Sequence, residues 1–505
     1  MIVDVRDLPE DESLRAEVVV VGSGIAGAGV AMHLARRGVD VIMLESGREV
    51  FDPEIQALND VTFLGKPHRA LDPEAGYHAY LPPQLRGVSR VRQFGGTSNV
   101  WTGKWKYLQP SDFAERPWVP FSEWPLSYEE LQVHYRAAAA DYGFEDLEAE
   151  TQRPELGRLR TRIADAGLKM SSFWWEESPT RTRLRFGDEM QSLTNLRVVL
   201  GATATELRLD RSGRRIETVS CRSLEGRSLD VTGDQVVLAM GAIETPRLLL
   251  ASDRDRSGGI GNAHDLVGRF YSDHPKHHSA TLAPGPTTRA FANELQYGPK
   301  PRFCVCFALD DKTQKSRNLL EHVVYLKPIY SSRKRAALDT LLRRPACRDG
   351  IGRVADYRVK LATEQVPNPE SRVRLDHARD RLGMRQAALD WRFTEQDHRS
   401  LAEIVKLCRE RFEAAGLGVF DFGHGSPTIE TMTDAAHQMG TTRMAIHPEK
   451  GVVDTDCRVF GTDNLFVAGS AVFPTGPSYS PTFTILALAR RLAVHLLERR
   501  DAGVL

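Results

Sequence analysis

The chain has 505 residues, which is long enough for two or three domains or for two large interleaved ones. It carries 67 Lys and Arg residues against 67 Asp and Glu residues, so its formal net charge is zero. Because affinity for nucleic acid depends on an excess of basic side chains, this balance argues against a nucleic-acid partner. The sequence shows no apolar run of the roughly 20 residues that span a membrane and no signal-like run after Met1. We therefore expect a cytoplasmic protein without a transmembrane segment.

The cysteines show neither a C-x-x-C pair nor the spacing of a metal site. We therefore predict no metal centre, and thiols kept reduced in a reducing compartment. The six cysteines are at positions 221, 304, 306, 347, 408 and 457.

The first periodic stretch of the chain reads as a strand, a glycine turn, a helix and a second strand. Residues 18–21 are an unbroken run of valines, typical of a parallel strand that is covered on both faces. Gly22, Gly24 and Gly27 follow in a G-x-G-x-x-G pattern, which lets a dinucleotide pyrophosphate approach the N-terminus of the helix. Glu45 ends the second strand, where a carboxylate accepts hydrogen bonds from an adenosine ribose and repels a ribose phosphate. The pattern favours FAD or NAD over NADP.

A second glycine-rich segment covers residues 93–103. Its two adjacent glycines and small hydroxyl residues suit a backbone that passes close to a flat ring or a phosphate. A plain turn would explain the two glycines alone. As cofactor contacts from this segment we predict Gly95, Gly96, Thr97, Ser98, Asn99 and Trp101.

Two further segments predict strands that end near the same site. Residues 195–207 are β-rich, and residues 235–252 read as a buried strand, a turn at Gly241 and a helix opened by Thr245-Pro246. The second unit would bring its turn to the sheet edge that carries the first glycine turn, so a long cofactor would contact both. From these segments we predict Thr203 and Gly241 as cofactor contacts.

The C-terminal segment, residues 464–497, repeats this arrangement. A strand at 465–468 leads into a glycine, then a loop, then a proline-opened helix whose free N–H groups suit an anionic part of a flavin. The predicted cofactor contacts here are Gly469, Ser470, Pro481 and Thr482.

From His274 to about Asp434 the pattern changes to alternating strands and loops, which predicts a separate substrate-facing domain. This part also contains a basic stretch. It is either a solvated loop or a docking patch for an electron acceptor or an acidic membrane surface. Its basic residues are Arg333, Lys334, Arg335, Arg343, Arg344, Arg348 and Arg353.

With these motifs the chain resembles the glucose-methanol-choline (GMC) oxidoreductases, in particular the branch of pyranose 2-oxidase, glycoside 3-oxidases and the flavin subunits of fructose or gluconate dehydrogenase. The resemblance covers nearly the whole chain. Besides the glycine turns and Glu45, it rests on Gly95-Gly96-Thr97-Ser98-Asn99-x-Trp101, Gly241 to Pro246, Val267-Gly268-Arg269 with Asp273-His274-Pro275, Glu364 to Val373, His437 to Thr441, Pro474-Thr475 and Pro481 to Thr484.

The resemblance implies an α/β fold in which a Rossmann-like FAD-binding domain is interleaved with an α+β substrate-binding domain built on a mostly antiparallel sheet. We place the FAD-binding domain at residues 1–140, 190–273 and 435–505. The substrate-binding domain then comprises residues 141–189 and 274–434.

The resemblance also implies the chemistry, namely oxidation of a hydroxyl group by hydride transfer to flavin N5 with His437 as the general base. The chain departs from the family at two positions. Val100 stands where pyranose oxidase carries its flavin-linked histidine, so FAD is expected to be non-covalent. Ser480 stands where the family has a second His or an Asn, so we include Ser480 with His437 in the catalytic set. The predicted substrate contacts are His274, Gln365, Ser478 and Tyr479.

The predicted function is therefore FAD-dependent oxidation of a hydroxyl group in a sugar, a glycoside or a sugar-like natural product. The electron acceptor is oxygen, a quinone or a protein, and the sequence does not choose between oxidase and dehydrogenase. Two alternatives remain open. The chain is the flavin subunit of a larger dehydrogenase that passes electrons to a haem or iron–sulfur partner, or it is a lyase of the same fold in which FAD is structural.

Overall fold

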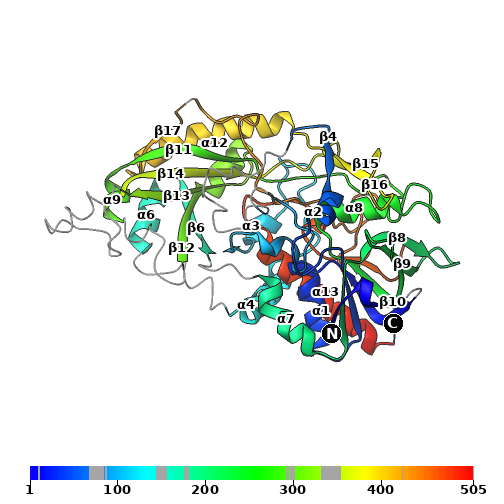
Figure 1. Cartoon of the computed structure of the whole chain (residues 1–505). Helices are drawn as coiled ribbons and strands as arrows, with labels where there is room; N and C mark the ends of the chain where they lie inside the picture. The colour runs from blue at the N-terminus through cyan, green and yellow to red at the C-terminus, as the bar shows by residue number, and fades with distance from the viewer. Residues whose placement is uncertain are drawn as a thin grey trace.

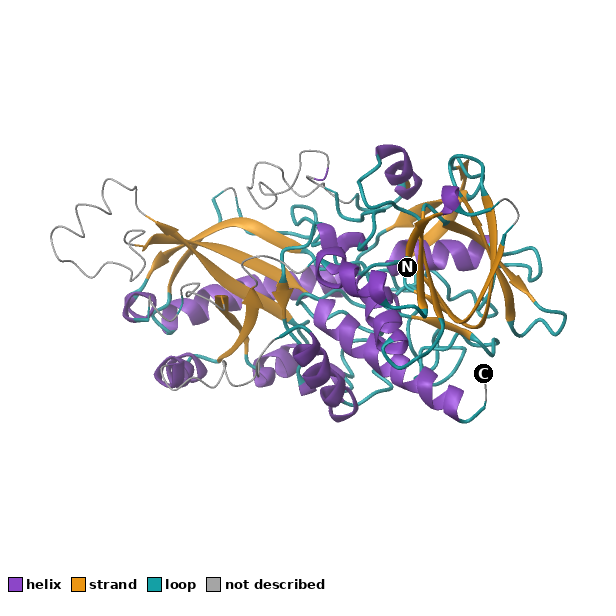
Figure 2. Cartoon of the chain, turned by 60° about the horizontal axis from the view of Figure 1, so that its bottom comes forward, coloured by secondary structure: helices purple, strands orange, loops and turns teal. Residues whose placement is uncertain are grey.

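The computed structural model describes residues 1–9, 12–67, 85, 88–143, 156–175, 181–291, 295, 302–330, 354–423 and 425–503. Two large sheets lie at opposite ends of this structure, and helices lie between them (Figures 1 and 2). Both ends of the chain lie on the side of the first sheet (Figure 1). The basic stretch between residues 333 and 353 falls outside the described residues.

The first sheet has eight strands in the order β1–β7–β3–β2–β10–β9–β8, and β18 pairs with the C-terminal half of β10. The strands β1, β7, β3, β2, β10 and β18 run parallel to one another. Strands β9 and β8 continue the sheet from β10 as an antiparallel meander. The valines of residues 18–21 are buried, as expected for a strand covered on both faces. The bounds are β1 (Ile2–Asp4), β2 (Ser13–Val21), β3 (Val41–Glu45), β7 (Leu196–Leu200), β8 (Thr203–Leu209), β9 (Ile216–Arg222), β10 (Ser228–Leu238) and β18 (Leu465–Val467).

Glycines allow helix α1 (Ile25–Ala35) to start directly at the end of β2. Gly22 has a φ of +105°, in the region that only glycine adopts at low cost. A Cβ atom at Gly27 would lie 1.9 Å from the carbonyl oxygen of Gly22, so any other residue would push the helix off the strand. Helices α1, α7 (Thr182–Ser192) and α8 (Gly241–Ala251) pack on strands of this sheet, while α13 (Thr482–Asp501) packs on α1, and α4 (Tyr128–Asp141) packs on α13.

The second sheet has seven antiparallel strands in the order β17–β11–β14–β13–β12–β6–β5. One of its faces packs on α6 (Gly157–Asp165) and α12 (Glu395–Ala414), with Leu159, Ile404 and Phe412 fully buried between them. The other face points toward the interior of the molecule. The bounds are β5 (Lys104–Trp105), β6 (Leu168–Trp175), β11 (Lys276–Pro284), β12 (Arg302–Leu309), β13 (His322–Tyr330), β14 (Val354–Thr363) and β17 (Gly418–Asp421).

A small three-stranded sheet, β15–β16–β4, lies beside α8. The predicted domain boundaries remain a prediction. Strand β5, from the predicted FAD-binding domain, joins the second sheet, and most of α7, from the predicted substrate-binding domain, packs on α1 and β7 near the first sheet. The remaining bounds are β4 (Val61–Phe63), β15 (Arg372–Arg379), β16 (Arg385–Asp390), α2 (Pro53–Gln56), α3 (Pro110–Phe113), α9 (Pro286–Ala290), α10 (Asp311–Arg317), and the 3₁₀ turns η1 (Val5–Asp7), η2 (Ala57–Asn59), η5 (Gly96–Asn99) and η7 (Ser470–Val472).

None of the helices in the described part of the chain combines the length and the apolar character needed to cross a membrane.

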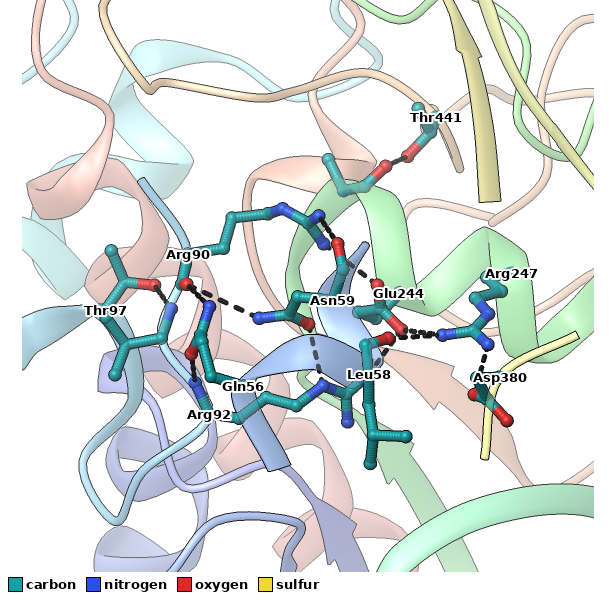
Figure 3. A network of polar contacts seen from close by, with 12 residues as sticks. Gln56, Leu58, Asn59, Arg90, Arg92, Thr97, Glu244, Arg247, Asp380 and Thr441 are labelled. Carbon is teal, nitrogen blue, oxygen red and sulfur yellow. Dashed lines mark hydrogen bonds and ion pairs between the residues drawn. The ribbon is translucent and has the colours of Figure 1, made fainter. Parts of the chain in front are cut away.

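Helix α8 begins earlier than the sequence predicted. The prediction placed Pro246 at the first helical position, but the helix starts at Gly241 and encloses the proline. Pro246 has no N–H group, so it leaves the carbonyl oxygen of Ala242, four residues earlier, without its helical donor. The hydroxyl of Thr441 donates a hydrogen bond of 2.7 Å to this oxygen and replaces the missing donor (Figure 3). A residue from the distant 437–441 motif therefore completes the helix.

We expect Thr441→Val to lower the free energy of unfolding by about 1–3 kcal/mol, because the carbonyl of buried Ala242 loses the hydroxyl that replaces its helical donor. The adjacent Thr442 provides a matched control: it is also fully buried, but its hydroxyl has no hydrogen-bond partner among the described residues. Thr442→Val should therefore cost little or nothing. Urea denaturation of both variants tests this, and equal losses would contradict the assigned role of Thr441.

Candidate active site

A cavity of about 620 Å³ reaches from the carboxyl edge of the first sheet to the inner face of the second. Its volume is in the range of cofactor and small-molecule sites. Both predicted catalytic residues, His437 and Ser480, line it. So do most of the predicted cofactor contacts, namely Gly22, Gly24, Glu45, Gly96, Thr97, Ser98, Trp101, Thr203, Gly241, Gly469, Ser470, Pro481 and Thr482.

Three predicted cofactor residues lie behind the cavity wall. Gly27 packs the helix against the strand, as described above. Gly95 donates its N–H to the hydroxyl of Ser23 at 2.9 Å, and the Asn99 side chain donates to the carbonyl of Phe94, also at 2.9 Å. These residues shape the glycine loop, and the cavity is lined by their neighbours.

The end of the cavity near β2 and β3 suits an anionic dinucleotide. Gly24 is the N-cap of helix α1 and offers no side-chain cap. A Cβ atom at Gly24 would meet no atom within 4 Å, so the helix N-terminus opens onto free space. Buried Glu45 accepts hydrogen bonds from the N–H and hydroxyl of Ser23, at 3.0 and 2.5 Å, and from the N–H of Gly47. At the other end, Nε2 of Gln438 is buried without a partner among the described residues, which leaves a donor for a bound acceptor. The donor set and the space fit FAD.

Arginine side chains form hydrogen bonds and ion pairs in the cavity wall near α8 (Figure 3). Arg90 and Arg92 line the cavity and bind the carboxylate of Glu244 on α8, at 2.9 and 2.7 Å. Arg247, one turn further along α8, binds the same carboxylate at 3.0 Å and Asp380 at 2.6 Å. Burial opposes ionisation of Glu244, but the three guanidinium charges outweigh it and lower its pKa to about 2.

We expect Glu244→Gln to destabilise the protein by about 3–5 kcal/mol, because three closely packed guanidinium groups lose the carboxylate they share. Glu54→Gln serves as the control, because Glu54 forms an exposed ion pair with Arg381 and such pairs contribute little. Chemical denaturation measures both variants. An equally small effect of the two substitutions would show that the Glu244 cluster is not a stabilising centre.

At the far end of the cavity, His437 pairs with His274. Their Nδ1 atoms are 2.9 Å apart, so one ring donates a hydrogen bond to the other. His274 is buried, whereas His437 is half-buried at the cavity wall. Nε2 of His437 makes no hydrogen bond with a described residue and is therefore free for a ligand.

The buried carboxylate of Asp273 holds this pair in place. It accepts hydrogen bonds from the backbone N–H groups of His274 at 2.6 Å, of Ala435 at 3.1 Å and of His437 at 3.0 Å. Ala436, between the last two donors, has a φ of +57°, which is rare for a residue with a side chain. The strained turn lets two N–H groups converge on one carboxylate.

Burial keeps both imidazoles neutral. It lowers the pKa of His437 well below its usual value, and the nearby His274, Lys276 and Lys104 lower it further. Burial and the charge of Lys276 lower the pKa of His274 to about 3. At neutral pH both rings can therefore accept a proton.

The other predicted substrate contacts lie outside the cavity lining. Gln365 accepts hydrogen bonds from the Trp391 ring at 2.8 Å and from the backbone of Asp273 at 3.3 Å, so it supports the Asp273 turn. Tyr479 is buried and donates its hydroxyl to Glu321 at 3.0 Å. Ser478 is buried and its hydroxyl has no partner among the described residues. His274 reaches the cavity only through His437.

Sequence reasoning missed three basic residues that line the same end of the cavity, Lys104, Lys276 and His278. The signal was present in the sequence. Lys276 and His278 alternate in a strand directly after His274-Pro275, and Lys104 follows the glycine-rich segment closely. Charged residues in a strand that should be buried indicate a site. Within the described residues, no cluster of three or more His, Cys, Asp or Glu side chains could hold a metal ion.

Family models agree with this geometry. Two models described as GMC oxidoreductase match residues 178–276 and 367–489, and one described as FAD dependent oxidoreductase matches residues 17–53. The chain therefore contains GMC oxidoreductase domains. It is an FAD-dependent oxidoreductase, as the sequence motifs implied.

Curated relatives of the same length support the assignment. The chain is 25% identical to 2-methyl-1,2-propanediol dehydrogenase of Mycolicibacterium austroafricanum, over 96% of each chain. It is 24% identical to the fructose dehydrogenase large subunit of Gluconobacter japonicus, over 98% of this chain and 100% of that one. It is 25% identical to paromamine 6'-oxidase of Streptomyces fradiae, over 97% of this chain and 93% of that one.

A solved structure shows the same fold. Pyridoxine 4-oxidase from Mesorbium loti superposes with a TM-score of 0.62 at 20% identity, over 96% of this chain and 99% of that one. At this identity the likeness concerns the fold alone.

Proposed function

We propose that this chain oxidises a hydroxyl group of a sugar, a glycoside or a sugar-like compound, with His437 as the base that accepts the hydroxyl proton. One observation carries the proposal: His437 presents a free Nε2 to the cavity while its Nδ1 is held by His274. The relatives named for fructose and paromamine support a sugar-like substrate.

The role of His437 as a base requires one tautomer of the histidine pair. Nε2 of His274 is buried beside Gly476 and has no hydrogen-bond partner among the described residues. We propose that this nitrogen carries the proton of the His274 ring, which leaves Nδ1 as an acceptor. Nδ1 of His274 then accepts the Nδ1–H of His437, and the lone pair of His437 lies on Nε2, toward the cavity. FAD, when bound, would supply the acceptor for the hydride that leaves the carbon bearing the substrate hydroxyl group.

Two further features follow from this proposal. Val100 is buried and lines the cavity at the position where the resemblance places a flavin-linked histidine. A valine cannot form that bond, so we propose that FAD is held non-covalently. Ser480 lines the cavity beside the start of α13, and its hydroxyl lies 3.4 Å from that of Thr482. We assign Ser480 to positioning the substrate hydroxyl group.

The test is anaerobic reduction of the bound flavin by a panel of sugars, glycosides and simple alcohols. We expect His437→Ala to slow reduction by about 10²–10⁴-fold, because the hydroxyl proton loses its acceptor, while FAD stays bound. His447→Ala, at an exposed histidine, is the control and should reduce at the wild-type rate. Reduction of the His437 variant at the wild-type rate would overturn the role of His437. Turnover without any change in flavin absorbance would indicate a lyase.

The pH dependence tests the histidine pair. Protonation removes the base, so the rate of flavin reduction should fall at low pH, and only below the lowered pKa of His437. We therefore expect no acidic limb near pH 6.5, the usual value for histidine. Because His274 contributes to the lowered pKa of His437, His274→Ala should move the acidic limb toward higher pH. His274→Asn, which keeps an acceptor oxygen, should restore part of the rate that His274→Ala loses. A wild-type limb near pH 6.5 would contradict this assignment.

A further inference from the structure

Ser480 reaches the cavity on an irregular segment, residues 474–481, which lies between η7 and α13. Residues 474–479 of this segment are buried, although they form neither a helix nor a strand. The hydroxyl of Ser480 lies 3.4 Å from that of Thr482, which makes a long and weak hydrogen bond. The place of the Ser480 hydroxyl in the cavity therefore depends on how the segment around it is anchored.

Tyr479, the residue directly before Ser480, anchors the segment to the second sheet. Its side chain is buried, and its hydroxyl donates a hydrogen bond of 3.0 Å to Oε1 of Glu321. The ammonium of Lys106 lies 3.4 Å from the centre of the tyrosine ring and forms a cation–π contact with it. The same ammonium donates to the hydroxyl of Ser171 on β6 at 2.7 Å. Charged groups at the second sheet therefore hold both the hydroxyl and the face of the ring.

Glu321 is in turn fixed as a charged acceptor. Its other carboxylate oxygen lies 3.1 Å from the ammonium of Lys169, which also binds Asp311 at 2.8 Å. Burial opposes ionisation of Glu321, but nearby groups, Lys169 foremost, outweigh it and lower the pKa of Glu321 to about 2. The carboxyl group is therefore ionised at neutral pH, and a hydrogen bond from Tyr479 to an ionised acceptor is stronger than one to a neutral acceptor.

The other side of the segment packs against the histidine pair. A Cβ atom at Gly476 would lie 2.3 Å from Cε of Met439 and 3.6 Å from Nε2 of His274, so the backbone passes close to both side chains. The hydroxyl of Thr475 accepts a hydrogen bond of 2.7 Å from the ring of Trp124. The segment is therefore held near its start by these contacts and near its end by the tyrosine.

We propose that Tyr479 is a positioning residue, which holds Ser480 where it meets the substrate hydroxyl group beside His437. The inference rests on the proposed function, in which Ser480 contacts that hydroxyl group. Tyr479 does not line the cavity, and its own hydroxyl is bound to Glu321, so its effect reaches the substrate through the neighbouring Ser480. This role replaces that of the substrate contact which the sequence predicted for Tyr479.

The test examines Tyr479→Phe in two backgrounds, by anaerobic reduction of the bound flavin with glucose, methyl glucoside, sorbitol and ethanol. The substitution keeps the ring and removes the hydroxyl. We expect it to lower the limiting rate of reduction by about 10- to 100-fold, because a displacement of about 1 Å at the reacting groups can cost this much. In the Ser480→Ala background it should change the rate by less than about 2-fold, because no hydroxyl remains to be positioned. Equal losses in the two backgrounds would overturn the inference.

Tyr135→Phe is the matched control. Tyr135 is also buried, and its hydroxyl forms a hydrogen bond of 2.6 Å with that of Thr484, but it lies on α4, outside the segment. This variant loses a buried hydrogen bond as well, and it should reduce at the wild-type rate. If Tyr135→Phe slowed reduction as much as Tyr479→Phe, a general loss of packing would explain both results and the inference would fail.

Substitutions of the acceptor give an independent check. Glu321→Gln keeps an oxygen for the tyrosine hydroxyl, whereas Glu321→Leu removes it. We expect Glu321→Leu to slow reduction as Tyr479→Phe does, and Glu321→Gln to retain more of the wild-type rate. A rate that Glu321→Leu left unchanged would contradict the role of this hydrogen bond.

Hydrogen exchange of the holoenzyme gives a readout that is independent of turnover. Tyr479→Phe should speed the exchange of the backbone amides in residues 475–480, while Tyr135→Phe should leave it unchanged. If none of the probes reduces the wild-type flavin, the proposed function fails, whereas faster exchange of this segment in Tyr479→Phe would still support the anchor. Unchanged exchange in Tyr479→Phe would overturn the inference.

Discussion

The hydrogen bonds accepted by Asp273 organise the histidine end of the candidate active site. Its buried carboxylate gathers the N–H groups of His274, Ala435 and His437, so one side chain fixes the relative position of two histidines that are 163 residues apart. Backbone hydrogen bonds between residues 268–276 and 433–441 extend this contact on both sides. Without this carboxylate, the strained turn at Ala436 would lose the hydrogen bonds of its two neighbours, Ala435 and His437, and would keep the bond from its own N–H to Asp434.

The two sheets contribute different kinds of groups to the cavity. The parallel sheet ends in glycine turns and open helix N-termini, which is how this kind of fold binds phosphates. The antiparallel sheet supplies side chains from its inner face, because successive residues of a strand alternate between the two faces. The cavity lies where the edge of one sheet meets the face of the other. His437 and Ser480 lie at that junction, on loops outside both sheets.

Buried charge is treated differently at the two ends of the cavity. Near the first sheet, the three arginines around Glu244 are matched by carboxylates, so that end forms a rigid wall. Near the second sheet, burial lowers the pKa values of His437 and His278, and the charge of Lys276 lowers both further.

The sequence by itself predicted the dinucleotide-binding edge, the GMC oxidoreductase domains and His437 as the candidate base. These features depend on local patterns: glycines at Gly22 and Gly27 where a side chain would clash, β-branched runs in buried strands, and helix starts after turns. The tertiary structure alone decided that His274 pairs with His437, that Thr441 completes helix α8, and that two distant strands place Lys104 and Lys276 over one cavity. Sequence spacing cannot specify such contacts, because they join segments whose distance in space depends on the packing of the whole chain.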